Sequence, residues 1–483
     1  MEVNSLAFLL FFVPVLGLNA ALSRWPRAQN TLLLAASWGY FALADAKALA
    51  LVAALTAAFF ALGRAIGAAG SDDRRAFRTT LLATALALAV LFWFKYLAFF
   101  AGVAGSLLGQ VGWTRLEIFA PLGVSFFVFR LVSYAVDIYR GKLDPETDFT
   151  AFAAYVSFFP TALAGPIERP APFLSQLRKA RTWDHRLVAD GARQILWGLA
   201  KKTLVADNLA AVVDQAWTDL HRLPGWTLLL VAPLYALQMY ADFSGYSDLA
   251  IGASKMLGIR ISPNFRYPFF ASNMAEYWRG WHISLTSWLT DYVFLPLNVA
   301  FRDLGKLGVC LAAVANLVLV GVWHGANWTF AVFGLYHGLL LVPLVLTGAM
   351  QKRTAPPAPG LLGLPRPVHA LRMLGVFCLS TLGLVVFRAE SLSQAGSYLS
   401  RAATFAGGEA TAVYDLLSKV ELRIGGLFAL LLLAVEWFRR DREYALVLDR
   451  GTPIWKAWPL YYGLVLLVVL YGASGAGFIY ARF

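Results

Sequence analysis

Residues 307–328 read LGVCLAAVANLVLVGVWHGANW, and this stretch decides the fold class. No charged side chain occurs in it before His324. A helix rises 1.5 Å per residue, so about 20 apolar residues cross the hydrocarbon core of a bilayer. The stretch therefore predicts a transmembrane helix that ends at a histidine.

Similar apolar runs recur along the whole chain. They cover residues 5–22, 31–44, 47–68, 79–104, 118–138, 226–240, 327–347, 369–387, 424–438 and 455–473. Of the 483 residues, 59% are hydrophobic and only 14% are charged, about half the charged fraction of a soluble domain. We therefore predict an all-α, polytopic membrane protein in which residues 1–483 form a single domain.

The net charge of +13 predicts the orientation in the membrane. Lys and Arg gather in cytoplasmic loops, next to anionic headgroups. If the first five runs cross in turn, one side carries Arg24, Arg27, Arg74, Arg75, Arg78, Arg140 and Lys142, and the other side carries Lys47 and Arg115. This asymmetry places the N-terminus outside, and the later runs place the C-terminus outside as well. No nucleic-acid-binding motif is present, so we expect no nucleic-acid partner.

A second group of basic residues follows a stretch rich in helix breakers. Residues 158–170 read FFPTALAGPIERP, which predicts irregular backbone, such as a re-entrant segment that lines a cavity. The group after it comprises Arg178, Lys179, Arg181, Arg186, Lys201 and Lys202. We expect these residues at the cytoplasmic surface, at the level of the headgroups, although they could also contact an anionic acyl donor.

Two further polar stretches interrupt apolar sequence. Residues 238–248, QMYADFSGYSD, contain Tyr240 and Asp242; they indicate either a buried polar network that fixes helix packing or a contact with substrate. Residues 276–285, EYWRGWHISL, contain Arg279, Trp281 and His282. Arg and Trp are ordinary anchors at a membrane interface, so this second stretch alone is a weak signal.

His324 is the histidine with the most informative context. It lies between Trp323 and the segment that contains Asn327 and Trp328, and glycines at 321 and 325 allow another group to approach the backbone closely. A buried histidine that only packs is the alternative. His282 and His324 have no third ligand at recognisable spacing, so we predict no metal site. Both cysteines lie in apolar runs and are expected to be small buried hydrophobes.

Four motifs together resemble the membrane-bound O-acyltransferases, within the bacterial branch that acetylates exported polysaccharides such as alginate. They are AGPI at 164–167 followed by Arg169, YADFSGYSDLAIG at 240–252, NMAEYWRGWHISLTSWL at 273–289 and WHGANW at 323–328. The motifs occur in the family's order over a catalytic core of residues 120–345. The sequence departs from the family's pattern at Thr290, where relatives usually carry an arginine.

The resemblance implies a ring of about 11 to 12 spans around a central catalytic tunnel, in a multi-pass protein of the bacterial inner membrane. It implies that His324 is the catalytic histidine and that His282 is its partner. It also indicates a set of substrate-binding residues, namely Trp323, Asn327, Trp328, Arg279, Trp281, Asp242 and Tyr240. Independently of the family, a neutral histidine suits the base that takes the proton from an acceptor hydroxyl.

The resemblance further implies the reaction partners. No cofactor is expected to be tightly bound; acetyl-CoA or an acyl-carrier thioester is the donor, and a polysaccharide is the acceptor. An extracytoplasmic acyltransferase that resembles serine hydrolases is expected to pass the acetyl group on. The alternatives are D-alanyl or other acyl transfer from a carrier protein, a proton-coupled transporter or flippase, and a scaffold without catalytic activity.

The C-terminal tail, residues 474–483, carries a separate motif. It ends in FIYARF, a Phe-x-Tyr-x-x-Phe pattern that resembles the tail of the small membrane peptide of teichoic-acid D-alanylation. The resemblance implies that Tyr480 carries the acyl group outward. An aromatic anchor at the end of a helix is the alternative.

Overall fold

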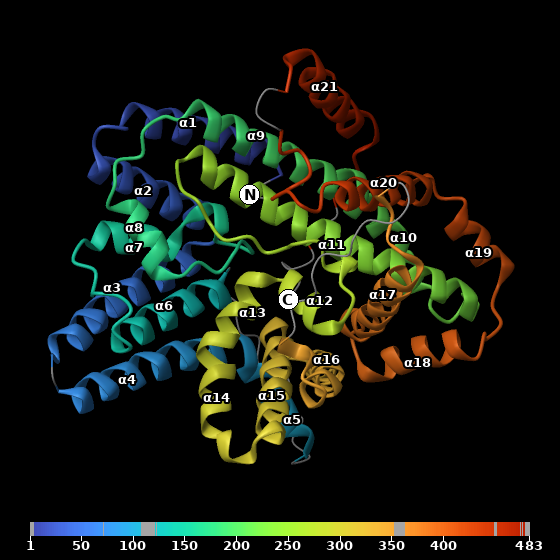
Figure 1. The fold of residues 1–483 in the computed structure, drawn as a ribbon, viewed down its shortest axis with the longest axis horizontal. Coiled ribbons are helices and arrows are strands. Elements are labelled where there is room, and N and C mark those ends of the chain that lie inside the picture. Colours follow the sequence, from blue (N-terminus) through green and yellow to red (C-terminus); the bar gives the residue numbers. More distant parts are fainter. Residues whose placement is uncertain are drawn as a thin grey trace. The chain divides into compact units, whose positions relative to one another are not determined.

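The computed structural model describes residues 4–70, 72–107, 121, 123–351, 363–448, 452–473, 475, 477 and 478. Within these residues every regular element is a helix, which confirms the predicted all-α class (Figure 1). The chain divides into two compact units. The first contains residues 1–195 and 249–262, and the second contains residues 196–248 and 263–483.

The first unit is built from the N-terminal helices. They are α1 (Leu6–Ala21), α2 (Pro26–Ala44), α3 (Ala46–Ala68), α4 (Asp73–Leu91), α5 (Leu97–Leu107), α6 (Val124–Tyr139), α7 (Phe149–Ser157), α8 (Pro170–Leu177) and most of α9 (His185–Ala200). A π-helical turn, η1 (Phe92–Tyr96), joins α4 to α5. Helix α6 packs against α3 and α4, and nearly all of its residues are buried, so it forms the centre of this unit.

The predicted irregular backbone begins where α7 ends. Pro160 lies in a 3-10 turn, η3 (Phe159–Thr161), because proline cannot continue the α-helical hydrogen bonding. The guanidinium of Arg130, on α6, donates to the carbonyls of Tyr155 and Val156 at 3.1 Å each. It thereby provides donors for carbonyls at the end of α7 that have no helical partner. The irregular backbone is confirmed, and its role in lining a cavity stays a prediction.

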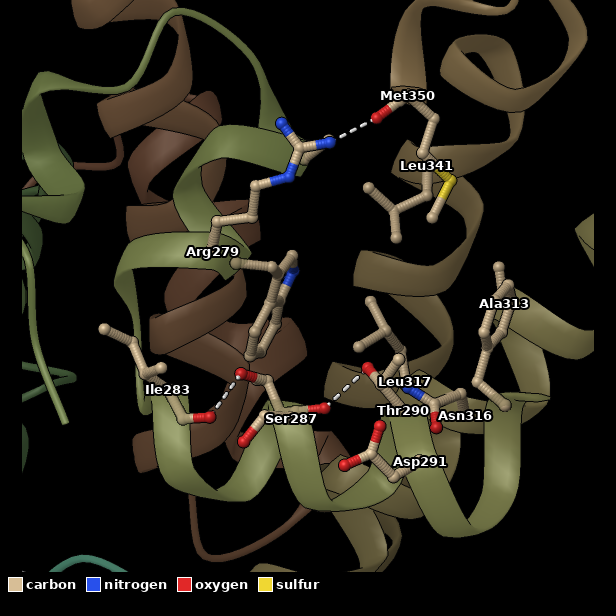
Figure 2. Close-up of a pocket in the computed structure, with 14 residues that line it drawn as sticks. Arg279, Ile283, Ser287, Thr290, Asp291, Ala313, Asn316, Leu317, Leu341 and Met350 are labelled. Carbon is tan, nitrogen blue, oxygen red and sulfur yellow. Dashed lines mark hydrogen bonds between the residues drawn. The ribbon is translucent and has the colours of Figure 1, made fainter. Parts of the chain in front are cut away.

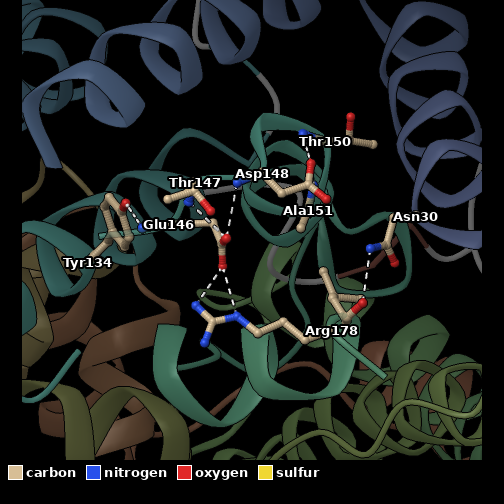
Figure 3. A network of polar contacts seen from close by, with 9 residues as sticks. Asn30, Tyr134, Glu146, Thr147, Asp148, Thr150, Ala151 and Arg178 are labelled. Atoms are coloured by element: carbon tan, nitrogen blue, oxygen red, sulfur yellow. Dashed lines mark hydrogen bonds and ion pairs between the residues drawn. The ribbon is translucent and has the colours of Figure 1, made fainter. Parts of the chain in front are cut away.

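A buried glutamate holds the loop between α6 and α7 (Figure 3). Glu146 Oε1 accepts from the backbone N–H of Thr147, and Oε2 accepts from the guanidinium of Arg178 at 3.0 Å. The phenolic oxygen of Tyr134 accepts from the backbone N–H of Glu146 at 2.9 Å. Asp148 caps α7 through the backbone N–H of Thr150. These contacts tie the loop to the end of α8 inside the first unit.

The second unit contains the remaining helices. They are α10 (Asp207–Thr218), most of α11 (Gly225–Met256), α12 (Met274–Gly280), α13 (Ile283–Leu289), α14 (Leu295–Ala300), α15 (Lys306–His324), α16 (Trp328–Leu346), α17 (Pro367–Arg388), α18 (Leu392–Ala403), α19 (Ala410–Leu417), α20 (Val420–Phe438) and α21 (Ile454–Tyr471). Two π-helical segments, η4 (Lys201–Ala206) and η6 (Thr290–Phe294), precede α10 and α14.

Helices α15 and α16 form a closely packed hairpin (Figure 1). A Cβ atom on Gly321 would lie 2.0 Å from the carbonyl oxygen of Phe330, and one on Gly334 would lie 2.3 Å from the carbonyl oxygen of Leu317. Only glycine fits at such distances, so the two backbones approach each other at these positions. The hairpin turn between the helices begins directly after His324.

Five helical stretches of the described residues are long and apolar enough to cross a membrane, and three shorter apolar helices accompany them. The five are Ala46–Ala68, Asp73–Leu107, Lys306–His324, Trp328–Leu346 and Pro367–Arg388. This identifies a multi-pass membrane protein, while the count of 11 to 12 spans stays a prediction. Cys310 is buried as expected, but Cys378 is exposed, so the prediction that both cysteines are buried was wrong for Cys378.

Candidate active site

The candidate site is centred on the end of α15. His324 is the last residue of the helix, because Gly325 takes an extended conformation and breaks it. The His324 side chain is only 5% exposed, and its ring centroid lies 5.0 Å from those of Trp323 and Phe387. A polar imidazole is therefore enclosed by aromatic side chains in an otherwise apolar part of the second unit.

His282 lies beside it. The two imidazole centroids are 6.2 Å apart, and Trp323 lies 5.7 Å from the His282 ring. Phe243, on α11, also packs against His282, with ring centroids 4.6 Å apart. His282 itself is 1% exposed. Residues 42 positions apart in the chain thus meet in one buried pair, as the motifs predicted.

Burial also sets the protonation state of His282. This residue lies in the turn between α12 and α13, outside the five candidate spans. Desolvation lowers the pKa of His282 to about 3, since burial penalises the charged imidazolium. A neutral imidazole can donate one hydrogen bond and accept another, and it can take a proton when a substrate brings one into reach.

Aromatic residues of the third motif support the histidine pair. Trp281 is buried and stacks on Tyr277, with ring centroids 5.5 Å apart. His337, on α16, stacks on the same tyrosine at 6.1 Å. Phe265 meets Trp281 edge-on at 5.2 Å. Trp323 contacts both histidine rings, and Trp281 directly precedes His282 in the chain, so these two predicted substrate-binding residues lie next to the histidines.

Three other predicted substrate-binding residues lie outside the buried cluster around His324. Asn327 caps α16 by accepting from the backbone N–H of Thr329, and its amide donates to the carbonyl of Glu390 at 2.8 Å. Trp328 is 54% exposed. Arg279 is exposed and donates to the carbonyl of Met350. In this structure Asn327 closes the helix hairpin, and neither Trp328 nor Arg279 joins the buried cluster around His324.

The acidic motif on α11 forms a buried ion network. Lys202 Nζ lies 2.7 Å from Asp242 Oδ1 and 2.7 Å from Asp207 Oδ1, and Lys201 Nζ lies 2.5 Å from Asp248 Oδ2. The network accounts for Asp242 through helix packing, which was one of the two alternatives that the sequence left open.

Tyr240, at the start of the same motif, belongs to this polar region. Its hydroxyl donates to Glu436 Oε2, on α20, at 2.8 Å. Its ring also lies 6.4 Å from that of Trp281. Lys201 Nζ lies 6.0 Å from the centre of the same ring, so Tyr240 links the ion network to the aromatic surroundings of the histidines.

The C-terminal tail approaches the same aromatic group. Phe478 is buried, stacks on Tyr246 at 4.6 Å and lies 6.2 Å from Phe243, the residue that packs against His282. Tyr480 lies outside the described residues. The last described residue of the tail is thus one aromatic side chain away from the histidine pair.

A cavity of about 520 Å³ opens next to the site (Figure 2). It lies between α12, α13 and η6 on one side and α15 and α16 on the other, and its lining includes Ile283, the neighbour of His282. Figure 2 shows Arg279 at one end and Thr290, Asp291 and Asn316 at the other. Asn316 is 8% exposed, and its Oδ1 accepts no hydrogen bond from any described residue. The cavity therefore combines an apolar lining with a buried acceptor.

Comparison with known proteins identifies the family. The model of the membrane-bound O-acyltransferase family matches residues 77–362, more than half of the chain. The chain belongs to this family. Its members are O-acyltransferases, so the chain is an enzyme, and the interpretations as a transporter or a scaffold are set aside.

Several curated relatives of this O-acyltransferase cover most of its length. It is 36% identical over 421 residues to the probable alginate O-acetylase AlgI of Azotobacter vinelandii. The matched region covers 85% of this chain and 79% of that protein. It is 33% identical to the peptidoglycan O-acetyltransferase of Helicobacter pylori, over 51% of each chain. It is 30% identical to the teichoic acid D-alanyltransferase of Bacillus subtilis, over 46% of this chain and 58% of that protein.

The structure also corrects the surface position predicted for three basic residues of this O-acyltransferase. Lys201, Lys202 and Arg181 were expected at the membrane surface, yet their exposed fractions are 4%, 4% and 6%. The two lysines are ion-paired in the network, and Arg181 donates to Asn30 Oδ1 at 2.9 Å. Buried carboxylates and amides supply the partners that make these positions tolerable for a cation.

Sequence interpretation also missed two residues near the site. Phe243 was part of a recognised motif, but its place against His282 was not foreseen. Asn264 was not singled out at all, although it is fully buried and contacts Ile283 and Ser284, the two residues directly after His282. A polar amide within PNF, close to the motif that begins at Asn273, was the available signal.

Proposed function

We propose that this O-acyltransferase moves an acetyl group from a cytoplasmic thioester, acetyl-CoA or an acyl carrier, towards a polysaccharide outside the bacterial inner membrane. The observation that carries the proposal is the buried pair of His324 and His282, 6.2 Å apart between ring centroids and enclosed by aromatic residues. The names of the relatives pair acetyl or D-alanyl transfer with alginate, peptidoglycan or teichoic acid.

The reaction needs one base and a polarised carbonyl. The acceptor oxygen attacks the thioester carbonyl carbon, a C–O bond forms, and the C–S bond breaks. His324 takes the proton of the acceptor hydroxyl and returns it to the departing thiolate sulfur. His282 donates a hydrogen bond to the carbonyl oxygen as negative charge develops there. Exclusion of water by Trp323 and Phe387 protects the acyl group from hydrolysis.

The cavity in Figure 2 suits the arm of the donor. A thioester arm is a flexible chain with amide groups, and the cavity offers apolar walls together with the unused acceptor of Asn316. Asn316 precedes His324 by eight residues on α15, about 12 Å along the helix axis. Because Ile283 lines the cavity, an arm inside it would bring its end close to the His282 turn.

On the acceptor side, we propose that Tyr480 receives the acetyl group first. Phe478, two residues before Tyr480, contacts Tyr246 and Phe243, and this supports the proposal because Phe243 packs against His282. The phenol would attack the thioester with His324 as its base, which gives an aryl ester and a free thiol. An aryl ester has a good leaving group, so onward transfer to the serine of an extracytoplasmic acyltransferase, and then to the polysaccharide, is chemically feasible.

The test is cleavage of the donor by the purified, full-length protein in detergent. We expect His324→Ala to lower turnover of acetyl-CoA or an acetylated carrier by about 10²- to 10⁴-fold, the range for loss of a positioned base. His221→Ala, at an exposed position, is the matched control and should leave turnover unchanged. Near-normal turnover by a folded His324→Ala protein would remove His324 from the mechanism.

D-Alanyl transfer is the second candidate, because the chain is 30% identical to a teichoic acid D-alanyltransferase. The same assay with a D-alanylated carrier distinguishes the two. Faster turnover of the D-alanyl donor than of every acetyl donor would favour the second candidate.

A further inference from the structure

The turn that presents His282 is held by a neighbouring stretch of chain, residues 264–266. The backbone N–H of Arg266 donates to the carbonyl of Gly280 at 3.0 Å, and the backbone N–H of Ile283 donates to the carbonyl of Asn264 at 2.8 Å. These bonds bracket His282 on both sides in the sequence. The stretch 264–266 therefore runs alongside the turn and fixes both of its ends.

His282 needs such support because of its backbone conformation. Its φ is 46° and its ψ is 52°, in the left-handed region that residues with a Cβ rarely adopt. A conformation of this kind costs on the order of 1–3 kcal/mol and persists only when the surrounding structure enforces it. Without enforcement, the backbone would relax and the imidazole would move away from its place beside His324.

The side chain of Asn264 supplies the most specific part of this support. Its Oδ1 accepts from the hydroxyl of Ser284 at 2.6 Å, and its Nδ2 donates to the hydroxyl oxygen of Ser247 at 3.1 Å. Asn264, Ser247 and Ser284 are 0%, 2% and 3% exposed. One carboxamide thus joins α13, two residues after His282, to α11.

Helix α11 supports the imidazole in a second way. Phe243 and Ser247 are four residues apart on α11, so both point to the same face of the helix. Phe243 packs against the His282 ring, while Ser247 holds Asn264. One face of α11 therefore contacts the ring of His282 directly and supports the backbone of His282 through Asn264.

We propose that Asn264 is a positioning residue that holds His282 in its left-handed turn, with the imidazole directed at the reacting groups near His324. The proposal rests on the proposed function of the histidine pair. Asn264 takes no part in the proposed proton transfer. Its contribution is geometric, since a displacement of about 1 Å in a reacting group can cost on the order of 100-fold in rate.

The test is a double-mutant cycle between Asn264 and His282, measured as donor turnover by the full-length protein in detergent. Asn264→Leu keeps the size of the side chain and removes both hydrogen bonds. We expect it to lower kcat by about 10- to 100-fold, with KM for the donor changed less than about twofold. In a His282→Ala background the same substitution should lower kcat by less than about twofold.

Asn208→Ala is the matched control. Asn208 is a buried asparagine of the same unit, and its amide donates to three backbone carbonyls, those of Thr203, Leu204 and Tyr471. A general loss of packing should lower kcat in both asparagine variants. In the His282→Ala background it should lower kcat again by the same factor. An undiminished effect of Asn264→Leu in the His282→Ala background would overturn the proposal.

Ser284 keeps the proposal testable if Asn264→Leu does not fold. Ser284→Ala removes one hydrogen bond to Asn264, and Ser284→Thr keeps it. We expect Ser284→Ala to lower kcat several-fold and Ser284→Thr to restore it; equal loss in both variants would contradict the proposal. Normal kcat for His282→Ala would instead show that the proposed role of His282 itself is wrong.

Discussion

Replacement of Lys202 by methionine is expected to destabilise the fold strongly. The ammonium group contacts two carboxylates, Asp207 and Asp242, at 2.7 Å each, and all three residues are at least 96% buried. At an effective dielectric constant of 20, each contact at 2.7 Å corresponds to roughly 6 kcal/mol of Coulomb energy, which offsets the desolvation of the charges. Methionine fills a similar volume but leaves both carboxylates without this cation.

The expected loss in the free energy of unfolding is about 3–5 kcal/mol, the range for breaking a buried ion pair by removing one partner. Asp242→Asn should cost much less, because the trio changes from one net negative charge to none and the contact between Lys202 and Asp207 remains. The free energy is measured by denaturant titration of the purified protein in detergent micelles. A larger loss for Asp242→Asn than for Lys202→Met would refute this reasoning.

Lys255→Met is the matched control for this prediction. Lys255 is also buried and contacts Asp190 Oδ2 at 2.9 Å, in the first unit. However, the side chain of Asp190 is 25% exposed and keeps a second contact with Arg193 at 3.4 Å. Water and this arginine can compensate the remaining charge, so the expected loss is about 1 kcal/mol or less.

Three further outcomes are expected. Gly321→Ala should lower the free energy of unfolding by about 1–3 kcal/mol, because its Cβ would lie 2.0 Å from the carbonyl oxygen of Phe330. Gly375→Ala is the control and should not lower it, because a Cβ at Gly375 meets open space. Equal stability of the two variants would contradict this prediction. Burial lowers the pKa of His282 to about 3, while its pKa in the unfolded chain is about 6.5. Between these two values only the unfolded state binds the proton. The free energy of unfolding should therefore fall as the pH drops below 6.5, by about 2 kcal/mol at pH 5. His282→Gln should flatten that part of the stability profile, and an unchanged slope would be evidence against it. Tyr480→Phe keeps the ring but removes the phenolic oxygen, so acetylation of the polymer should stop although the protein is expressed at the normal level. Polymer acetylated to the wild-type level would instead show that the tail serves only as an aromatic anchor.

Much of the fold could be predicted from the sequence, because helices that cross a lipid bilayer require long apolar runs that are easy to recognise. Apolar runs such as 307–323 and 47–68 became helices of the expected type, since a chain in hydrocarbon must satisfy its own backbone hydrogen bonds. The meeting of His282 and His324 followed from the motifs. Their separation and the aromatic residues around them depended on packing, which no spacing rule contains.

Other features depended on contacts between distant residues. The surface position expected for Lys201 and Lys202 was wrong, because the carboxylates that compensate them include Asp242 and Asp248, some 40 residues later in the chain. Asn264 stayed unrecognised for the same reason. Its partners, Ser247 and Ser284, lie 17 and 20 residues away, and only the folded chain brings the three together.

The π-helical segment Lys201–Ala206 has a consequence for how this region can change during evolution. A π turn holds about one residue more than an α turn, so it shifts the phase of every later side chain by about 100°. Deletion of a single residue there would let the helix continue without interruption and would rotate Asp207 relative to Lys202. Relatives that lack the extra residue would need another arrangement of charges, and a gap of one position in their alignment would mark where the ion network had been rebuilt.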